Sequence, residues 1–111
     1  MSRRIVSDED MERALHFLAQ NAAEIGHARQ RMLESDALLK RTEAIAFLTS
    51  KQTSAEAKKA DARASDKWLE ASTEAAVAAG EFQKQLALRE AAAARIEAWR
   101  SESANYRGMK A

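Results

Sequence analysis

The sequence contains no proline, no cysteine and only three glycines. Because a proline ring kinks or breaks a helix interior, its absence permits long uninterrupted helices. The absence of cysteine excludes disulfide bonds and thiolate chemistry and agrees with a reducing compartment. Glycine-rich phosphate loops and the G-x-S-x-G nucleophile elbow are also missing, so we expect no enzyme activity.

Long apolar runs and a strong charge of either sign are missing as well. No run approaches the roughly 20 apolar residues needed to span a bilayer, and residues 1–6 lack the apolar core of a secretory signal. Lys and Arg total 18 against 17 Asp and Glu, a formal net charge of +1. We therefore expect a cytoplasmic protein with no membrane partner, whose electrostatic function depends on local clusters.

Metal-ligand patterns are equally scarce. His16 and His27 lie eleven residues apart, about 16 Å along a helix axis, so they cannot bind one metal within a single helix. Neither belongs to an H-E-x-x-H pattern, and we expect ordinary polar roles, with no metal and no cofactor. Acidic residues near the N-terminus are typical of the first turn of a helix: Asp8, Glu9, Asp10 and Glu12.

What the chain does contain, between residues 11 and 46, is an apolar residue at every seventh position. The repeat comprises Met11, Leu18, Ile25, Met32, Leu39 and Ala46. It predicts a long helix with a coiled-coil seam over residues 8–50, capped by Ser7. Leu15 and Ala22 are expected to be the companion seam positions. Gly26 either weakens this helix, by up to about 1 kcal/mol, or admits close helix packing.

A second repeat predicts a helix over residues 67–103. Trp68, Ala75, Phe82 and Ile96 are seven or fourteen residues apart, and we expect them to share a seam with three companions, Ala79, Leu86 and Ala93. The connection, residues 51–66, is either a short helix capped by Thr53 or Ser54, or a frayed turn. Residues 104–111 are expected to form a frayed tail.

Two long helices with a short connection predict an all-α single domain, residues 1–111, folded as an antiparallel helical hairpin. One narrow seam cannot hold all the large apolar residues, Phe17, Leu33, Leu38 and Trp99 among them. We therefore expect a homo-oligomer that buries a second face. Charged residues also fall at seam positions, either fixing the register or lying at the edge: Arg29, Asp36, Glu43 and Arg89.

Basic residues on the first helix are the best candidates for a binding site. Arg29 and Lys40 are eleven residues apart, and Arg31 and Arg41 are ten apart, spacings that return each pair to nearly the same side of a helix. Together the four could form a basic stripe that follows a nucleic-acid backbone. Nearby Glu34 and Glu43 support the equal alternative, a solvated face of mixed charge.

A second candidate group lies near the C-terminus, where bases alternate with aromatics: Arg95, Trp99, Arg100, Tyr106 and Arg107. Aromatic rings can stack on unpaired bases. Trp99 follows Ile96 by three residues, however, and a tryptophan at that spacing is more often a packing anchor. This group is therefore a candidate contact for either nucleic acid or a protein partner.

Three segments resemble a group of small helical tailed-phage proteins encoded near recombination genes. They are residues 10–19 (DMERALHFLA), 29–47 and 94–107 (ARIEAWRSESANYR). The layout is similar to that of the UvsY family of recombination mediators, in which a basic cluster leads into aromatic or apolar residues. Here the matching positions are Leu39, Lys40 and Arg41, followed by Ile45, Phe47 and Leu48.

The resemblance implies a non-enzymatic mediator in the bacterial host cytoplasm. Such proteins oligomerise, bind single-stranded DNA and assist a recombinase or a single-strand annealing or binding protein. Lys40 and Arg41 would then contact DNA, with Arg29 and Arg31 added from helical spacing. This chain is shorter and less basic than the family pattern. Two rival hypotheses are a phage protein-binding factor, such as an inhibitor of a host defence complex, and a virion scaffolding coiled coil.

Overall fold

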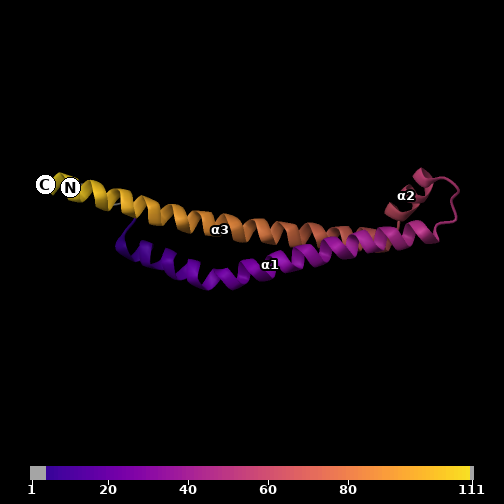
Figure 1. The fold of residues 1–111 in the computed structure, drawn as a ribbon, viewed down its shortest axis with the longest axis horizontal. Coiled ribbons are helices and arrows are strands. Elements are labelled where there is room, and N and C mark those ends of the chain that lie inside the picture. Colours follow the sequence, from indigo (N-terminus) through magenta and orange to yellow (C-terminus); the bar gives the residue numbers. More distant parts are fainter. Residues whose placement is uncertain (1–4, 111) are drawn as a thin grey trace. The chain divides into compact units, whose positions relative to one another are not determined.

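The structure is a computed structural model that describes residues 5–110. Its three helices are α1 (Asp8–Thr49), α2 (Ala55–Arg63) and α3 (Asp66–Lys110), as Figure 1 shows. All regular secondary structure in the described residues is helical. The two long helices pack against each other, which confirms the predicted all-α hairpin.

The contacts divide the chain into two compact units. Unit 1 comprises Met1–Ile25 with Lys84–Ala111, and unit 2 comprises Gly26–Gln83. Unit 1 pairs the start of α1 with the later part of α3. Unit 2 contains the rest of α1, all of α2 and the start of α3, so its three helices are consecutive along the chain. The strongest candidate binding residues on α1 therefore all belong to unit 2.

The start of α1 is a reciprocal capping pair. The Asp10 amide donates to Ser7 Oγ at 3.1 Å, and the Ser7 amide donates to Asp10 Oδ2 at 3.3 Å. Two amides that lack intrahelical partners are thereby satisfied. The predicted cap at Ser7 is confirmed.

The connection forms a short helix, which decides between the two alternatives. Ser54 is its N-cap, and its Oγ accepts from the Ala57 amide at 3.1 Å. Ser50 Oγ donates to Asp61 Oδ2 at 2.7 Å, which ties the end of α1 to α2. The Trp68 amide then donates to Ser65 Oγ at 3.2 Å at the start of α3.

The C-terminal end of α3 differs from the prediction. The helix continues to Lys110, so the predicted end at residue 103 is wrong and residues 104–110 are helical. Gly108 continues the helix, and no described glycine has a positive φ. Proline, the stronger terminator, is absent from the sequence.

The seam uses the predicted repeat but a different companion position. The residues of the seven-residue repeat in α1 are half-buried. Ala14 is 3% exposed and Ala28 is 1% exposed, whereas Leu15 is 49% exposed. The companions therefore lie three residues after each repeat position, not four, and the predicted seam roles of Leu15 and Ala22 are wrong.

In α3 the shift is partial. Ala71 and Ala92 are buried and Ala93, predicted for the seam, is exposed, whereas the other predicted companions, Ala79 and Leu86, are half-buried like the repeat positions Ala75 and Phe82. Small side chains on both helices let the two backbones approach closely. The charged residues that shared the rejected companion position therefore lie at the edge of the seam: Arg29 and Asp36 are exposed and Glu43 is half-buried. Arg89, a repeat position of α3, is also exposed.

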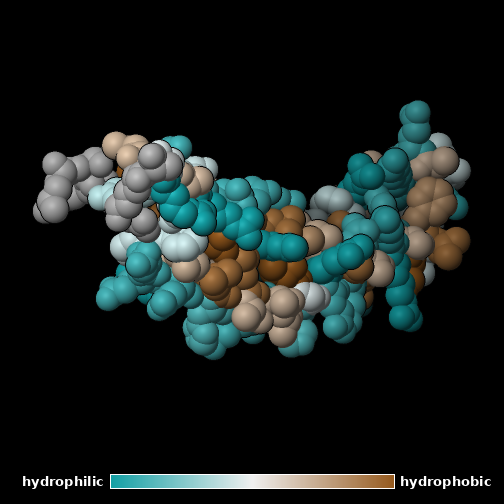
Figure 2. All heavy atoms as spheres, turned by 60° about the vertical axis from the view of Figure 1, so that its left-hand side comes forward, coloured by the Kyte–Doolittle hydropathy of each residue, from teal (hydrophilic) through white to brown (hydrophobic). Residues whose placement is uncertain are grey.

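The buried core consists largely of alanine. Within the described residues its apolar members are Val6, Ala14, Ala28, Ala62, Ala71 and Ala92. Burying an alanine removes little apolar area from water, so this core contributes modestly to stability. Hydrophobic surface remains visible among hydrophilic side chains on the face drawn in Figure 2.

Across the described residues, no helix combines the length and the apolar composition that crossing a bilayer requires.

Candidate nucleic-acid interface

The four basic candidates on α1 are all exposed: Arg29, Arg31, Lys40 and Arg41. They do not form one stripe. Residues two apart on a helix are about 200° apart, so Arg29 and Arg31 point to different sides. Arg29 and Lys40 share one side, whereas Arg41 lies about 80° around the helix from Arg31 and about 100° from Lys40. The predicted stripe is therefore reduced to the pair Arg29 and Lys40.

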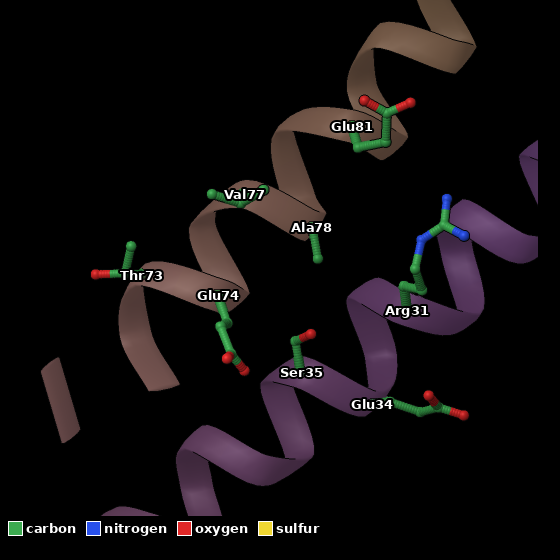
Figure 3. Close-up of a pocket in the computed structure, with 8 residues that line it drawn as sticks. All are labelled: Arg31, Glu34, Ser35, Thr73, Glu74, Val77, Ala78 and Glu81. Carbon is green, nitrogen blue, oxygen red and sulfur yellow. The ribbon is translucent and has the colours of Figure 1, made fainter. Parts of the chain in front are cut away.

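Arg31 lies in an acidic setting. It lines an open groove between α1 and α3 in unit 2, about 440 Å³ in volume, shown in Figure 3. Three carboxylates line the same groove: Glu34, Glu74 and Glu81. Because three negative groups surround one guanidinium, a phosphate there would meet net repulsion. Arg31 is thus the weakest of the four as a DNA contact.

Lys40 is paired with the Asp36 carboxylate, which another anion can replace. Its Nζ lies 2.9 Å from Asp36 Oδ2, one helical turn away, and both side chains are well exposed. Exposed pairs of this kind contribute only about 0.3 to 0.5 kcal/mol. A phosphate oxygen could replace the Asp36 carboxylate at little energetic cost.

The two carboxylates that were expected to pair with the basic groups, Glu34 and Glu43, are engaged elsewhere. Glu43 Oε1 lies 2.6 Å from Arg63 Nε on α2. Glu34 Oε1 accepts from Gln30 Nε2 at 2.9 Å. Because Glu43 is held by α2, its charge is compensated without Lys40 or Arg41. The expected mixed-charge pairing of Glu43 with these two bases is therefore not found.

Helix α2 adds basic residues that were not among the predicted site residues. Lys58 Nζ lies 5.7 Å from the centre of the Phe47 ring, and Lys59 is exposed on the same short helix. Phe47 follows Lys40 by two helical turns and shares its side of α1. The one sequence feature that pointed to these lysines was the cap at Ser54, which predicted that residues 55–64 could be helical. Which side of α1 this helix covers depends on tertiary packing.

These contacts define a basic surface on unit 2, here called the Lys40 surface: Arg29, Lys40, Phe47 and Lys58. It combines cations with a half-buried aromatic ring, the side-chain types that bind single-stranded nucleic acid. Arg41 lies about 100° away around α1 and borders the surface.

The C-terminal candidates are mostly engaged in local structure. Trp99 Nε1 donates to Asp8 Oδ1 at 2.7 Å, so the packing-anchor alternative for Trp99 gains support. Arg100 Nη1 lies 3.3 Å from Glu97 Oε1, and Arg107 Nε donates to the Ser103 carbonyl at 3.4 Å. Arg95 and Tyr106 are exposed, and Arg95 lines a shallow hollow with Phe17 and Leu88. No stacking platform is assembled from this group in the described residues.

The two histidines lie in separate places on α1. His16 lines a shallow depression with Glu9, Glu12 and Arg13, and His27 is exposed. Within residues 5–110, no cluster of three or more His, Asp or Glu side chains is placed to hold a metal ion.

Comparison with known proteins gives no relative: no family model matches the chain, and neither a curated protein nor a solved structure matches it.

Proposed function

We propose that this chain is a non-enzymatic accessory of DNA recombination that binds single-stranded DNA through the Lys40 surface. The observation that carries the proposal is the Glu43–Arg63 pair, at 2.6 Å. It compensates the Glu43 carboxylate within the protein, which leaves Lys40 paired with the exposed Asp36, a partner that a phosphate can replace at little cost. Lys58, whose Nζ lies over the Phe47 ring, adds a further cation to this surface.

The biological role follows from the resemblance to phage recombination mediators. A protein that holds single-stranded DNA without chemistry can present the strand to a recombinase or an annealing protein. The near-neutral net charge of +1 favours weak binding by each copy. Several weak sites could act together on one strand if copies associate.

The test is binding of a fluorescent oligothymidine, measured by anisotropy across a salt series. The Lys40→Ala, Lys58→Ala double variant should bind at least tenfold more weakly, and its salt slope should fall by about 0.7 for each lost phosphate contact. The matched control is the Lys84→Ala, Arg89→Ala double variant, which likewise removes two positive charges, here from exposed positions on unit 1. Its affinity should be close to that of the unaltered protein.

Two results would contradict the proposal. One is the absence of binding at low salt, and the other is equal binding by the double variant and the control. Either result would favour the rival hypothesis, a phage protein-binding factor that does not bind DNA.

A further inference from the structure

Unit 1 has a hollow with an apolar floor between α1 and α3. Its volume is about 330 Å³, and the buried Ala14 and Ala92 are part of its lining. Phe17 from α1 and Leu88 from α3 add larger apolar side chains. Phe17 is half-buried, and Leu88 is 42% exposed. An apolar side chain of a ligand can therefore leave water here.

The charged lining of this hollow is basic. Among the described residues, Arg13 and Arg95 line it and no carboxylate does. Arg95 is exposed, and it has no hydrogen bond or ion pair within residues 5–110. Arg13 Nη2 lies 2.8 Å from Asp10 Oδ1 in an exposed pair. A guanidinium has several N–H donors, so this bond leaves Arg13 able to hold a second anion. The excess of positive charge favours a ligand that carries one negative charge.

The basic and apolar parts of the lining lie at different levels along the helices. Arg13 precedes Phe17 by four residues on α1, and Arg95 follows Leu88 by seven on α3. Because the two helices of the hairpin run in opposite directions, both steps lead toward the same end of the hollow (Figure 1). The steps are about 6 Å on α1 and about 10 Å on α3. The hollow therefore has a basic end and an apolar end.

We propose that this hollow binds the C-terminus of a partner protein that ends in an apolar residue. Arg13 and Arg95 hold the free carboxylate, and the last side chain packs against Phe17 and Leu88. In a C-terminal residue the carboxylate and the side chain branch from the same Cα, which matches a hollow with a basic end and an apolar end. Arginine forms paired hydrogen bonds with carboxylates. Capture of a C-terminal carboxylate is a recurring mode of peptide recognition.

The shape of the hollow favours a chain end over a free small acid. Sites for small molecules enclose most of the ligand surface, whereas this hollow lies on the outside of a pair of helices and is open to solvent. A ligand bound here keeps one side in water. A chain end suits such a site, because the residues before it continue into the solvent.

Nucleic acid fits this hollow less well. Single strands bind where bases stack on exposed ring faces and where cations follow the phosphates. Phe17, the aromatic lining residue in the described part of the chain, is half-buried, and both guanidiniums lie toward one end. The hollow also belongs to unit 1, whereas the Lys40 surface belongs to unit 2. The proposal therefore does not rest on DNA binding.

The first experiment titrates ¹⁵N-labelled protein with a pentapeptide of glycine and serine that ends in phenylalanine. Amide NMR signals of residues 13–17 and 88–95 should shift, with a dissociation constant of about 1 mM or tighter. The same peptide with a C-terminal amide should bind at least tenfold more weakly, because it lacks the charge that the guanidiniums hold. A peptide ending in alanine should also bind more weakly, because it lacks the large apolar side chain.

The second experiment tests the basic end with a matched pair of variants. Arg95→Ala should weaken binding of the phenylalanine peptide at least fivefold, and Arg95→Lys should restore part of the loss. The control is Arg89→Ala, which removes the same exposed side chain from α3 of unit 1 at a position that does not line the hollow. Its affinity should be unchanged. Circular dichroism checks that all variants remain helical.

The third experiment tests the apolar end. Leu88→Asp removes an apolar lining side chain and adds a charge that repels the carboxylate of the peptide, so binding should be lost. The control is Ala87→Asp, which adds the same charge at an adjacent exposed position. Because that position is about 100° away around α3, the control should bind within twofold to threefold of the unaltered protein.

Two further measurements separate this site from DNA binding. The Lys40→Ala, Lys58→Ala variant should bind the peptide as the unaltered protein does, and excess oligothymidine should not displace the peptide. A protein that binds the peptide and ignores DNA would keep this site and reject the proposed function. A protein that binds DNA and ignores the peptide would do the reverse.

Several results would overturn the proposal. One is the absence of NMR shifts at peptide concentrations of several millimolar, and another is equal binding of the acid and amide forms of the peptide. Displacement of the peptide by oligothymidine would assign the hollow to nucleic acid. Binding of N-acetylphenylalanine without binding of the pentapeptide would assign it to a small free acid.

Discussion

The indole of Trp99 donates a hydrogen bond from Nε1 to Asp8 Oδ1 at 2.7 Å, joining residues ninety-one positions apart in the sequence. Nearby, Glu102 Oε1 accepts from the backbone amides of Ile5 and Val6 at 3.1 and 3.3 Å. Together these contacts hold the start of α1 and the residues before it against the later part of α3. Trp99 therefore has a structural role within unit 1.

Trp99→Phe should lower the free energy of unfolding by about 1 kcal/mol, since it keeps a ring but removes a hydrogen bond to a carboxylate that solvent can reach. The control is Trp68→Phe, because Trp68 Nε1 is buried and has no hydrogen-bond partner within the described part of the chain. Removing that N–H should cost less. Urea unfolding followed by circular dichroism compares the two, and a larger loss for Trp68→Phe would contradict the assigned role of the Trp99 bond.

The Ser7–Asp10 cap predicts a dependence on acid. The hydrogen bond with the Ser7 side chain lowers the pKa of the Asp10 carboxyl below its ordinary value of 3.8, and the Ser7 amide and Arg13 act in the same direction. Because the folded pKa is lower than the unfolded one, this stabilisation is complete above the ordinary value. It is lost as the pH falls through the folded pKa.

Thermal melts from neutral pH to below the folded pKa of Asp10 should therefore show an acid-dependent loss of stability that Asp10→Asn reduces. Ser7→Ala should lower stability at neutral pH by about 1 kcal/mol and also reduce the acid dependence. Glu9→Gln removes a neighbouring carboxylate outside the pair and should leave the dependence in place. An unchanged acid response in Asp10→Asn would show that other groups cause it.

Asp36→Asn should strengthen binding of single-stranded DNA, in contrast with the basic variants. Asp36 holds Lys40 at 2.9 Å, and its charge also repels phosphate. Removing the charge should raise affinity roughly twofold to tenfold at low salt, with the gain shrinking as salt screens it. The comparison variant is Glu90→Gln, an exposed carboxylate of unit 1. An equal gain from both variants would indicate a net-charge effect without a defined site.

The sequence predicts the helices well because the seven-residue repeat and the serine caps are local signals. It does not select the companion seam position, since Ala14 and Leu15 are both apolar. Hydrophobicity alone favours Leu15. The correct choice depends on α3, where Ala71 and Ala92 occupy the matching positions and allow close approach of the two backbones.

For the candidate site, too, part of the arrangement was predictable from the sequence and part was not. That Arg29 and Arg31 point to different sides follows from helical geometry, so the division of the basic residues between sides of α1 was predictable from sequence. The engagement of Glu43 by Arg63 was not, because it joins residues on different helices. The position of Lys58 beside Phe47 likewise depends on how α2 packs.

Asn21 should be replaceable with a gain in stability. It is 7% exposed in the alanine-rich seam, and its Nδ2 has no hydrogen-bond partner among residues 5–110. A buried donor without an acceptor costs about 1 to 3 kcal/mol, although the smaller alanine also forfeits packing contacts. Asn21→Ala should therefore raise the free energy of unfolding by about 0.5 to 1.5 kcal/mol.

The control for this prediction is Ala28→Asn, which places the same amide at the next companion position, where Ala28 is buried. It should be destabilising by 1 kcal/mol or more, about the cost of an unpaired buried amide. Chemical unfolding measures both variants. A loss of stability in Asn21→Ala would indicate that the amide has a partner in solution, and then a polar contact at this position would help to set helix register.

Gly26 and Gly80 lie within α1 and α3 without a packing reason to be glycine. A Cβ added at either position meets nothing within 4 Å, and neither has a positive φ. The alternative that Gly26 admits close helix packing is therefore not supported within the single chain. Alanine restricts the unfolded chain more than glycine does, so each Gly→Ala variant should gain about 0.5 to 1 kcal/mol.

Gly108→Ala should gain less, because Gly108 is near the end of α3, where helices fray. Thermal unfolding of the three single variants checks this order. A loss of stability in Gly26→Ala would require a neighbour that the single chain does not supply.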